Sequence, residues 1–212
     1  MKLVVGLGNP GSRYELTRHN AGFWVAERLA GRFCVSFRRK ASFLADVAEV
    51  RMGLLGGSAA QAQLLIIAKP QTYMNLSGQS VRAITDFYGL GTEDVVVVFD
   101  DIDLAPGRVR IRASGAAGGH KGMASILAHL GTNDIPRVRV GVGRPSPGMV
   151  GRDFVLSQLS RDDTKVFAAT VELAAAAVET VLTEGVAVAM NRYNGAVAPG
   201  VSDGEGESGT EN

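Results

Sequence analysis

Five consecutive apolar residues, Val95 to Phe99, constrain the fold of this chain more than any other feature of its sequence. A strand that is apolar on both sides is typical of the centre of a sheet with both faces covered. Segments with helical and with strand periodicity alternate around it. The pattern predicts the α/β class: a single domain with a central, twisted, mixed but mostly parallel sheet, flanked by helices on both faces.

Apolar periodicity and turn residues also give the expected order of elements. Strands are expected at residues 2–7, 45–52, 64–68, 95–99, 109–112 and 138–142. Helices are expected at residues 20–32, 76–88, 123–130 and 162–190, the last with a break near Gly185. Glutamates interrupt the apolar residues of the last segment, so it is interpreted as a packed helix and not as a membrane span.

Length and composition point to one globular domain. Of the 212 residues 46% are hydrophobic and 20% charged, and residues 1–195, which contain no repeat or Pro-rich linker, are expected to form a single domain. Residues 196–212 are rich in Gly, Ser and acids and are predicted to form a disordered tail. This tail holds four of the 21 acidic residues, so 22 basic residues face 17 acidic ones elsewhere, a balance compatible with a polyanionic partner.

The chain has one cysteine, Cys34. A single cysteine cannot form an internal disulfide or a cysteine-based metal site. A reducing compartment, most simply the cytoplasm, is therefore expected. The apolar run at the N-terminus is too short for a signal peptide.

A glycine-rich turn follows the first expected strand. Gly6, Gly8 and Gly11 match G-x-G-x-x-G, the fingerprint of an NAD-type oxidoreductase. That fingerprint requires a helix at the third glycine and an acidic residue at the end of the next strand. Here the helix is expected near Asn20, and the next candidate strand has no acid before Asp46. The turn is therefore expected to serve a different kind of site.

Polar side chains follow three of the expected strands. Asn9 and His19 follow the first, residues 69–75 follow the strand at 64–68, and the aspartates between Asp100 and Asp103 follow the strand at 95–99. Ligands of α/β sheets bind at the carboxyl ends of the strands. These side chains are therefore expected to converge if the strands are parallel neighbours.

The residue types suit a hydrolytic site. His19 is the candidate general base, and Asp100 would orient its ring. The amides of Asn9 and Asn75 would hold a carbonyl or an oxyanion. No serine stands in a nucleophile elbow, so water is the expected nucleophile. Each of these residues also has a structural alternative. His19 would cap a helix or lie on the surface, and the aspartates would form an Asx turn or bind a divalent cation. Asn9 would adopt an unusual turn conformation, and Asn75 would be the N-cap of a helix.

Arginines alternate on two expected strands. The sets are Arg108, Arg110 and Arg112 on one strand, and Arg137 with Arg139 on the other. Alternation places each set on one face, where it would contact a phosphate backbone or simply face solvent.

A second glycine-rich loop, residues 115–122, leads into the helix expected at 123–130. Its amides and Lys121 would suit a phosphate, although Gly122 stands where a Walker A loop has Ser or Thr. A flexible loop is the alternative. His129, further along that helix, is expected to be a solvated residue.

Together these motifs resemble those of bacterial peptidyl-tRNA hydrolases over nearly the whole chain, up to about Asn194. The segments that carry the resemblance are GLGNPG at 6–11 with Tyr14 and TRHN at 17–20, KPQTYMNLSG at 69–78, DDIDL at 100–104, and GGH at 118–120 followed by RVGVGRP at 139–145.

The resemblance implies hydrolysis of the ester between a peptide and the 3'-terminal ribose of tRNA, which frees trapped tRNA for translation. It implies that His19 activates water, that Asp100 keeps His19 basic and that Asn9 distinguishes an N-blocked peptidyl group from a free amino acid. The residues implied in binding the tRNA terminus, the peptide or acceptor-stem phosphate are Tyr14, Tyr73, Met74, Asn75, His120, Lys121, Arg112 and Arg139. A cytoplasmic monomer is expected, with no metal, nucleotide cofactor or membrane partner.

Lys121 departs from the family's pattern, which usually has asparagine after the histidine of the Gly-His pair. Lysine cannot accept a hydrogen bond, so only a binding location transfers to Lys121. A non-catalytic RNA-binding module on the same fold is therefore the remaining alternative.

Overall fold

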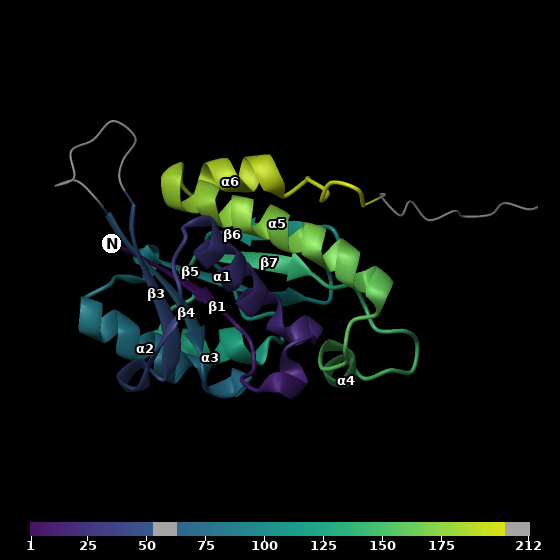
Figure 1. The fold of residues 1–212 in the computed structure, drawn as a ribbon, viewed down its shortest axis with the longest axis horizontal. Helices are drawn as coiled ribbons and strands as arrows, with labels where there is room; N and C mark the ends of the chain where they lie inside the picture. Colours follow the sequence, from purple (N-terminus) through teal and green to yellow (C-terminus); the bar gives the residue numbers. More distant parts are fainter. Residues whose placement is uncertain (53–62, 202–212) are drawn as a thin grey trace, which may run out of the picture.

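The computed structural model describes residues 1–52 and 63–201. Seven strands form one sheet in the order β2-β3-β4-β1-β5-β7-β6 (Figure 1). The strands are β1 (Lys2–Gly6), β2 (Arg38–Lys40), β3 (Ala45–Met52), β4 (Gln63–Pro70), β5 (Val95–Asp101), β6 (Val109–Arg112) and β7 (Arg137–Gly141). β4, β1, β5 and β7 are parallel neighbours, while β2, β3 and β6 pair in antiparallel fashion. The predicted mixed, mostly parallel sheet is confirmed.

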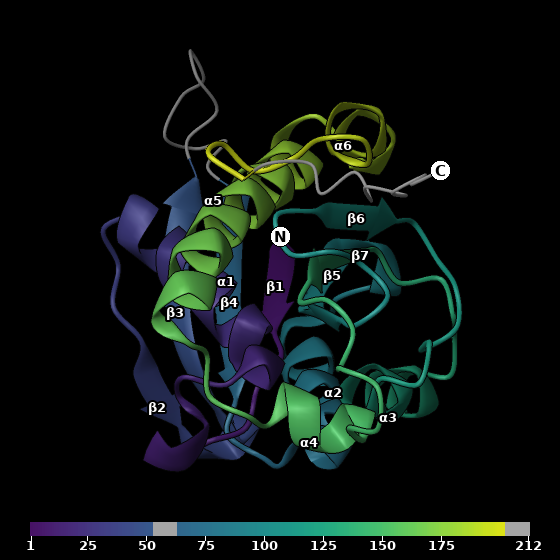
Figure 2. The ribbon, with the colours of Figure 1, turned by 90° about the vertical axis from the view of Figure 1, so that its right-hand side faces the viewer.

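Helices cover both faces of this sheet. They are α1 (Ala21–Arg32), α2 (Ser77–Tyr88), α3 (Lys121–Leu130), α4 (Gly151–Val155), α5 (Arg161–Thr183) and α6 (Val186–Tyr193). α1 and α5 share one apolar core with one face, and α2 and α3 share a second core with the other. The short α4 lies near one end of the sheet, apart from both helical layers (Figure 2).

Two elements, β2 and α4, were not predicted from the sequence, for different reasons. All three residues of β2 are basic and exposed, so this edge strand carries no apolar pattern. α4 has five residues, too few for helical periodicity to appear. The strand at β5 was recognised easily because all seven of its residues are buried.

The described part of the C-terminal segment is ordered. Val197 forms an isolated antiparallel bridge with Arg108, and Ala198 donates its N–H to the carbonyl of Gly107 at 2.7 Å. The prediction of a disordered tail from residue 196 was wrong for residues 196–201, because this segment bonds to the backbone of Gly107 and Arg108, just before β6. Residues 202–212 lie outside the described residues.

Among the described residues, α5 is the one helix with the length and hydropathy of a membrane span. Phe167, Val171 and Val178 on this helix are buried in the same core cluster as α1 and the sheet. Its apolar side chains therefore serve as core, as the sequence suggested.

Glycines bring α1 against β1. A Cβ on Gly6 would lie 2.1 Å from the carbonyl oxygen of Gly22, and a Cβ on Gly8 would meet the ring of Phe23 at 2.6 Å. Because α1 begins well beyond Gly11, at Ala21, the motif offers no helix N-terminus to a pyrophosphate. The first glycines of G-x-G-x-x-G therefore serve helix–strand packing, and the NAD interpretation is wrong.

Gly22→Ala is expected to lower the free energy of unfolding by about 3 kcal/mol, because the fold must open to admit a methyl group. That Cβ would lie 2.2 Å from the amide nitrogen of Leu7 and 2.3 Å from the carbonyl oxygen of Val98. Gly31→Ala in the same helix is the control, since no atom lies within 4 Å of its Cβ. The control should leave stability unchanged or raise it by up to about 1 kcal/mol. Urea unfolding measures the free energy of unfolding of both variants. Equal values for Gly22→Ala and Gly31→Ala would contradict the close packing at Gly22.

Candidate active site

The carboxyl ends of the parallel strands open into one cavity of about 770 Å³. Because β1 lies between β4 and β5, the polar residues that follow these strands meet there, as expected. Of the site residues predicted from sequence, those that line it are Asn9, Tyr14, His19, Tyr73, Met74, Asn75, Asp100, His120, Lys121 and Arg139. Arg112 is the one that does not.

His19 and Asp100 are in direct contact. Nδ1 of His19 lies 2.9 Å from Oδ1 and 3.1 Å from Oδ2 of Asp100. A short 3-10 helix, Arg18–Asn20, carries the histidine to the cavity, and Asp100 is the sixth residue of β5. Since an ionised carboxylate only accepts hydrogen bonds, Nδ1 of His19 must be the protonated ring nitrogen. Its Nε2 is then free to accept a proton.

His120 binds the same carboxylate, at the oxygen that His19 also contacts. Its Nε2 lies 3.0 Å from Oδ1 of Asp100, and its Nδ1 accepts the N–H of Met123 at 3.2 Å, which makes His120 the N-cap of α3. A backbone N–H can only donate, so Nδ1 is unprotonated and Nε2 carries the proton of the neutral ring. The helix thus sets the tautomer of His120.

The environment of Asp100 favours its ionised form. Burial by itself would raise the pKa of this carboxyl, whose side chain is 3% exposed. The neighbouring His120 and His19 act more strongly in the opposite sense, by charge and by hydrogen bonds, and hold the pKa well below its ordinary range. Asp100 therefore remains an acceptor for both rings at neutral pH.

His19, Asp100 and His120 also have the composition of a metal site, because one ligand atom of each lies within 4.8 Å of the others. The contacts of 2.9 to 3.1 Å between each ring and the carboxylate are ordinary hydrogen-bond lengths. Two N–H donors on one carboxylate therefore explain the arrangement of these three side chains.

Asn9 joins the ends of two strands. Its Oδ1 accepts the N–H of Met74 at 2.9 Å, and its backbone N–H and carbonyl both bond to the side chain of Asn20. Its Nδ2 forms no hydrogen bond with any of the described residues, so this donor faces the cavity unpaired. Asn75 lines the cavity as well, and the N-cap interpretation of it was wrong, because α2 begins at Ser77 with Leu76 as its N-cap.

The aspartates after Asp100 form a turn. Oδ1 of Asp101 accepts the N–H of Asp103 at 3.0 Å, the Asx arrangement offered by the sequence as an alternative. Asp101 also pairs with Arg139, whose Nε lies 2.8 Å from Oδ2. Arg139 therefore reaches the cavity with a carboxylate beside it.

Arg137 differs from the other arginines of its predicted face. It is 2% exposed, and it donates to the carbonyls of Ile135, Asn133, Gly115 and Ala116. Placing it on a phosphate-binding face was wrong, because residues of the 115–122 loop cover it. Its guanidinium instead holds that loop, which lines one side of the cavity.

The other predicted basic residues lie nearer to solvent. Arg110 is exposed and lies opposite Arg139 in the backbone register of β6 and β7. Arg112 is half-buried. Lys121, the first residue of α3, is exposed on the cavity wall and has no ion pair with any described residue. His129 is exposed, as expected.

A wall of the cavity that the sequence did not predict comes from α4 and the residue after it. Gly151, Arg152, Val155 and Leu156 line the cavity from this side. They lie far along the chain from the other site residues and carry no recognisable motif. Only tertiary packing reveals them.

The chain is similar to known proteins over nearly its whole length. Residues 3–200 match the family model described as peptidyl-tRNA hydrolase. The chain is 48% identical over 193 residues to the peptidyl-tRNA hydrolase of Symbiobacterium thermophilum, covering 91% of this chain and 98% of the relative. It is 43% identical to that of Geobacillus thermodenitrificans, covering 92% and 100%. A solved structure, peptidyl-tRNA hydrolase from Acinetobacter baumannii, is similar with a TM-score of 0.82 at 33% identity, covering 93% of this chain and 96% of that chain.

The lowered pKa of Asp100 predicts how stability depends on pH. The stability that this carboxylate contributes is present above about pH 4, the ordinary pKa of aspartate, and is lost as the pH falls through the lowered value. Asp100→Asn lacks this titration. Wild type should therefore lose more free energy of unfolding than Asp100→Asn between about pH 5 and about pH 2, measured by urea unfolding. Parallel pH curves would mean that Asp100 titrates like an exposed aspartate.

Proposed function

The chain belongs to the peptidyl-tRNA hydrolase family and hydrolyses the ester bond of peptidyl-tRNA, and from that premise we propose that the reaction takes place at the His19–Asp100 pair. The observation that carries the proposal is the contact of His19 Nδ1 with both oxygens of Asp100, which leaves Nε2 as a base at the cavity. A cavity of about 770 Å³ has room for the ester and the groups next to it.

In the proposed reaction, Nε2 of His19 takes a proton from water while the water oxygen attacks the ester carbonyl carbon. The carbonyl oxygen of the resulting tetrahedral intermediate is negatively charged. Asp100 stabilises the imidazolium formed on His19. The ring then gives the proton to the ribose oxygen as the carbon–oxygen bond breaks, which yields a peptide carboxylic acid and free tRNA with its 3'-terminal hydroxyl restored.

Asn9 is proposed to recognise the peptidyl group. Because its Oδ1 already accepts the N–H of Met74, its orientation is fixed and Nδ2 is the donor available to a ligand. A peptide carbonyl oxygen accepts such a donor, whereas the α-ammonium group of an unblocked aminoacyl-tRNA offers only donors. This difference gives a physical basis for selecting an N-blocked substrate.

His120 is proposed to position Asp100. The sequence placed His120 among the substrate-binding residues, but both of its ring nitrogens are engaged, one by Asp100 and one by the N–H of Met123. Its ring connects the carboxylate to the first turn of α3. His120 would therefore act through Asp100 and His19.

The tRNA terminus is proposed to lie along the rim of the cavity. Tyr73 and Asn75 are exposed there and Tyr14 is half-buried, so their side chains are accessible to a nucleotide or to the adjoining peptide residue. Met74 is 4% exposed and packs beneath them. Aromatic rings are suitable surfaces for stacking an unpaired base.

Basic residues on the same rim are proposed to bind acceptor-stem phosphate. Lys121 offers an ammonium group that pairs with no carboxylate among the described residues, and the side chain of Arg139 is 23% exposed while its Nε pairs with Asp101. Arg112 lies beyond the cavity lining and would contact a more distant phosphate. Contacts to phosphate suit an enzyme that must accept many tRNA sequences.

We propose that the enzyme works as a monomer in the cytoplasm. The single cysteine suits a reducing compartment. Sedimentation at working concentrations tests the monomeric state.

The three histidines provide a matched test of the mechanism. His19→Ala should lower kcat for N-acetyl-aminoacyl-tRNA by about 100-fold or more, the usual contribution of a general base. His120→Asn, which keeps an acceptor able to cap α3 but loses the donor to Asp100, should lower kcat by a smaller factor. His129→Ala, at an exposed residue of α3 outside the cavity lining, should match the wild type. A fully active His19→Ala would exclude His19 as the base, and an inactive wild type would favour a non-catalytic RNA-binding module.

Lys121→Gln should raise KM about fivefold, equivalent to about 1 kcal/mol, with little change in kcat. The slope of log KM against log salt should fall by about one if the lysine neutralises one phosphate. Lys2→Gln is the control, because Lys2 pairs with Asp94 at the amino end of β1, away from the cavity. An unchanged salt slope in Lys121→Gln would mean that Lys121 only faces solvent.

A further inference from the structure

Arg18, the residue before His19, has a buried side chain with several partners. The side chain is 11% exposed, and its Cζ lies 4.5 Å from the centre of the Phe154 ring. Nη1 donates to the hydroxyl of Ser157 at 3.0 Å, and Nη2 to Oδ2 of Asp163 at 2.8 Å. A single guanidinium therefore connects the His19 segment to α4, to the turn after α4 and to the first turn of α5.

These partners support the cavity wall formed by α4. Phe154 belongs to α4, and the hydroxyl of Ser157 in turn donates to the carbonyl of Phe154 at 2.7 Å. Two backbone contacts run beside Arg18: the N–H of Leu159 donates to the carbonyl of Leu16 at 3.1 Å, and Thr17 bridges to Gln158. Arg18 is thus at the centre of the junction between the base and this wall.

α4 has only a small share of core packing. Of its five residues Val155 is buried and Phe154 packs, partly buried, against the core of α1 and α5, and a single helical turn is not stable by its own hydrogen bonds. A planar guanidinium can stack on a ring and donate to two acceptors at once, which a lysine ammonium cannot reproduce. The contacts of Arg18 therefore add to the small area of core packing that α4 has.

We propose that Arg18 is a positioning residue that fixes the α4 wall relative to His19, so that the peptidyl-tRNA terminus is held between them. This inference rests on the proposed function, because it takes the cavity to be the substrate site. Among the described residues no hydrogen bond or ion pair joins Arg18 to the carboxylate of Asp100, and by this proposal Arg18 does not touch the reacting atoms. Loss of the Arg18 side chain should weaken substrate binding and leave the chemistry of the His19–Asp100 pair unchanged.

The first test compares Arg18→Gln and Arg18→Lys with the wild type in hydrolysis of N-acetyl-aminoacyl-tRNA. Arg18→Gln should raise KM about tenfold while kcat stays within about threefold, the signature of lost binding. The pH profile of kcat should be unchanged, because the base and its carboxylate are untouched. Arg18→Lys should restore part of the binding, since it keeps the charge near Asp163.

The second test approaches the same junction from the α4 side. Ser157→Ala removes one acceptor of Arg18 without altering the His19 segment, and should raise KM in the same direction. Combined with Arg18→Gln it should add little, because both changes break the same contact. Ser157→Ala also keeps the proposal testable if Arg18→Gln does not fold.

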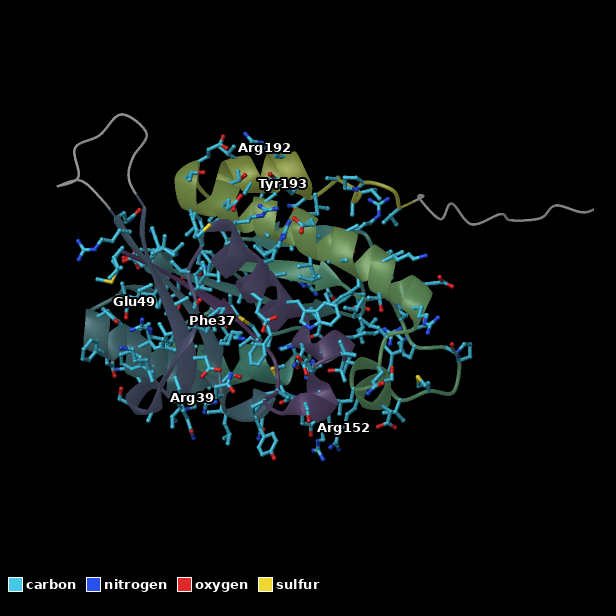
Figure 3. The ribbon with its side chains drawn as sticks, viewed as in Figure 1. Phe37, Arg39, Glu49, Arg152, Arg192 and Tyr193 are labelled. Atoms are coloured by element: carbon cyan, nitrogen blue, oxygen red, sulfur yellow. The ribbon has the colours of Figure 1, made fainter. Side chains whose placement is uncertain are left out.

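Arg192→Gln is the matched control. Arg192 also pairs with a carboxylate, Glu184, but it lies on α6, on the opposite side of the molecule from Arg152 of α4 (Figure 3). This variant should keep the wild-type KM and kcat. Inactivity of both the wild type and Arg192→Gln would contradict the proposed function and not the role of Arg18.

Amide hydrogen exchange gives a readout independent of activity. In Arg18→Gln the amides of residues 152–156 should exchange faster than in the wild type, while those of α5 beyond its first turn should not change. An unchanged KM together with a lower unfolding temperature would reduce Arg18 to an ordinary structural contact. A fall in kcat with a shifted pH profile would mean that it acts through His19. Either result overturns the proposal.

Discussion

The carboxylate of Asp100, buried at the end of a central strand, accepts hydrogen bonds from two imidazoles, and the rest of the site depends on this interaction. One bond fixes the proton of His19 on Nδ1 and leaves Nε2 as a base. The other connects the carboxylate to His120, whose remaining nitrogen caps α3. Two donors on an ionised acceptor offset the cost of burying its charge. A backbone N–H at the start of a helix is thereby linked, through the side chains of His120 and Asp100, to the tautomer of His19.

The sheet makes this arrangement possible. β1 lies between β4 and β5, so the residues that follow these parallel strands reach the same space. Gly6 and Gly22 allow α1 to approach β1 closely, which places the 3-10 turn with His19 beside the end of β5. The loop held by Arg137 forms one side of the cavity and α4 forms another. Packing far from the reacting atoms therefore determines the distances within the site.

Several residues of the cavity were predictable because each follows an apolar strand. Asn9, His19, Asn75 and Asp100 were selected in that way, and they do line one cavity. Arg137 was misjudged because period-2 alternation gives the face of a strand but not what covers that face, and here a loop covers it. The position of His120 beside Asp100 was not predicted, since 20 residues separate the two along the chain. Arg18 and α4 were overlooked for the same reason: their importance lies in contacts between distant segments.

The sequence by itself determined the α/β class, the bounds of most strands and helices and the chemical types gathered at the strand ends, because periodicity and turn residues act over short stretches of chain. The tertiary structure alone decided which nitrogen of each histidine is protonated, which arginines are buried and how the α4 wall meets the base. Those properties depend on distances of about 3 Å between atoms of different elements, and hydrogen bonds lose their strength within fractions of an ångström beyond that range. Only the packing of the helices on the sheet sets such distances.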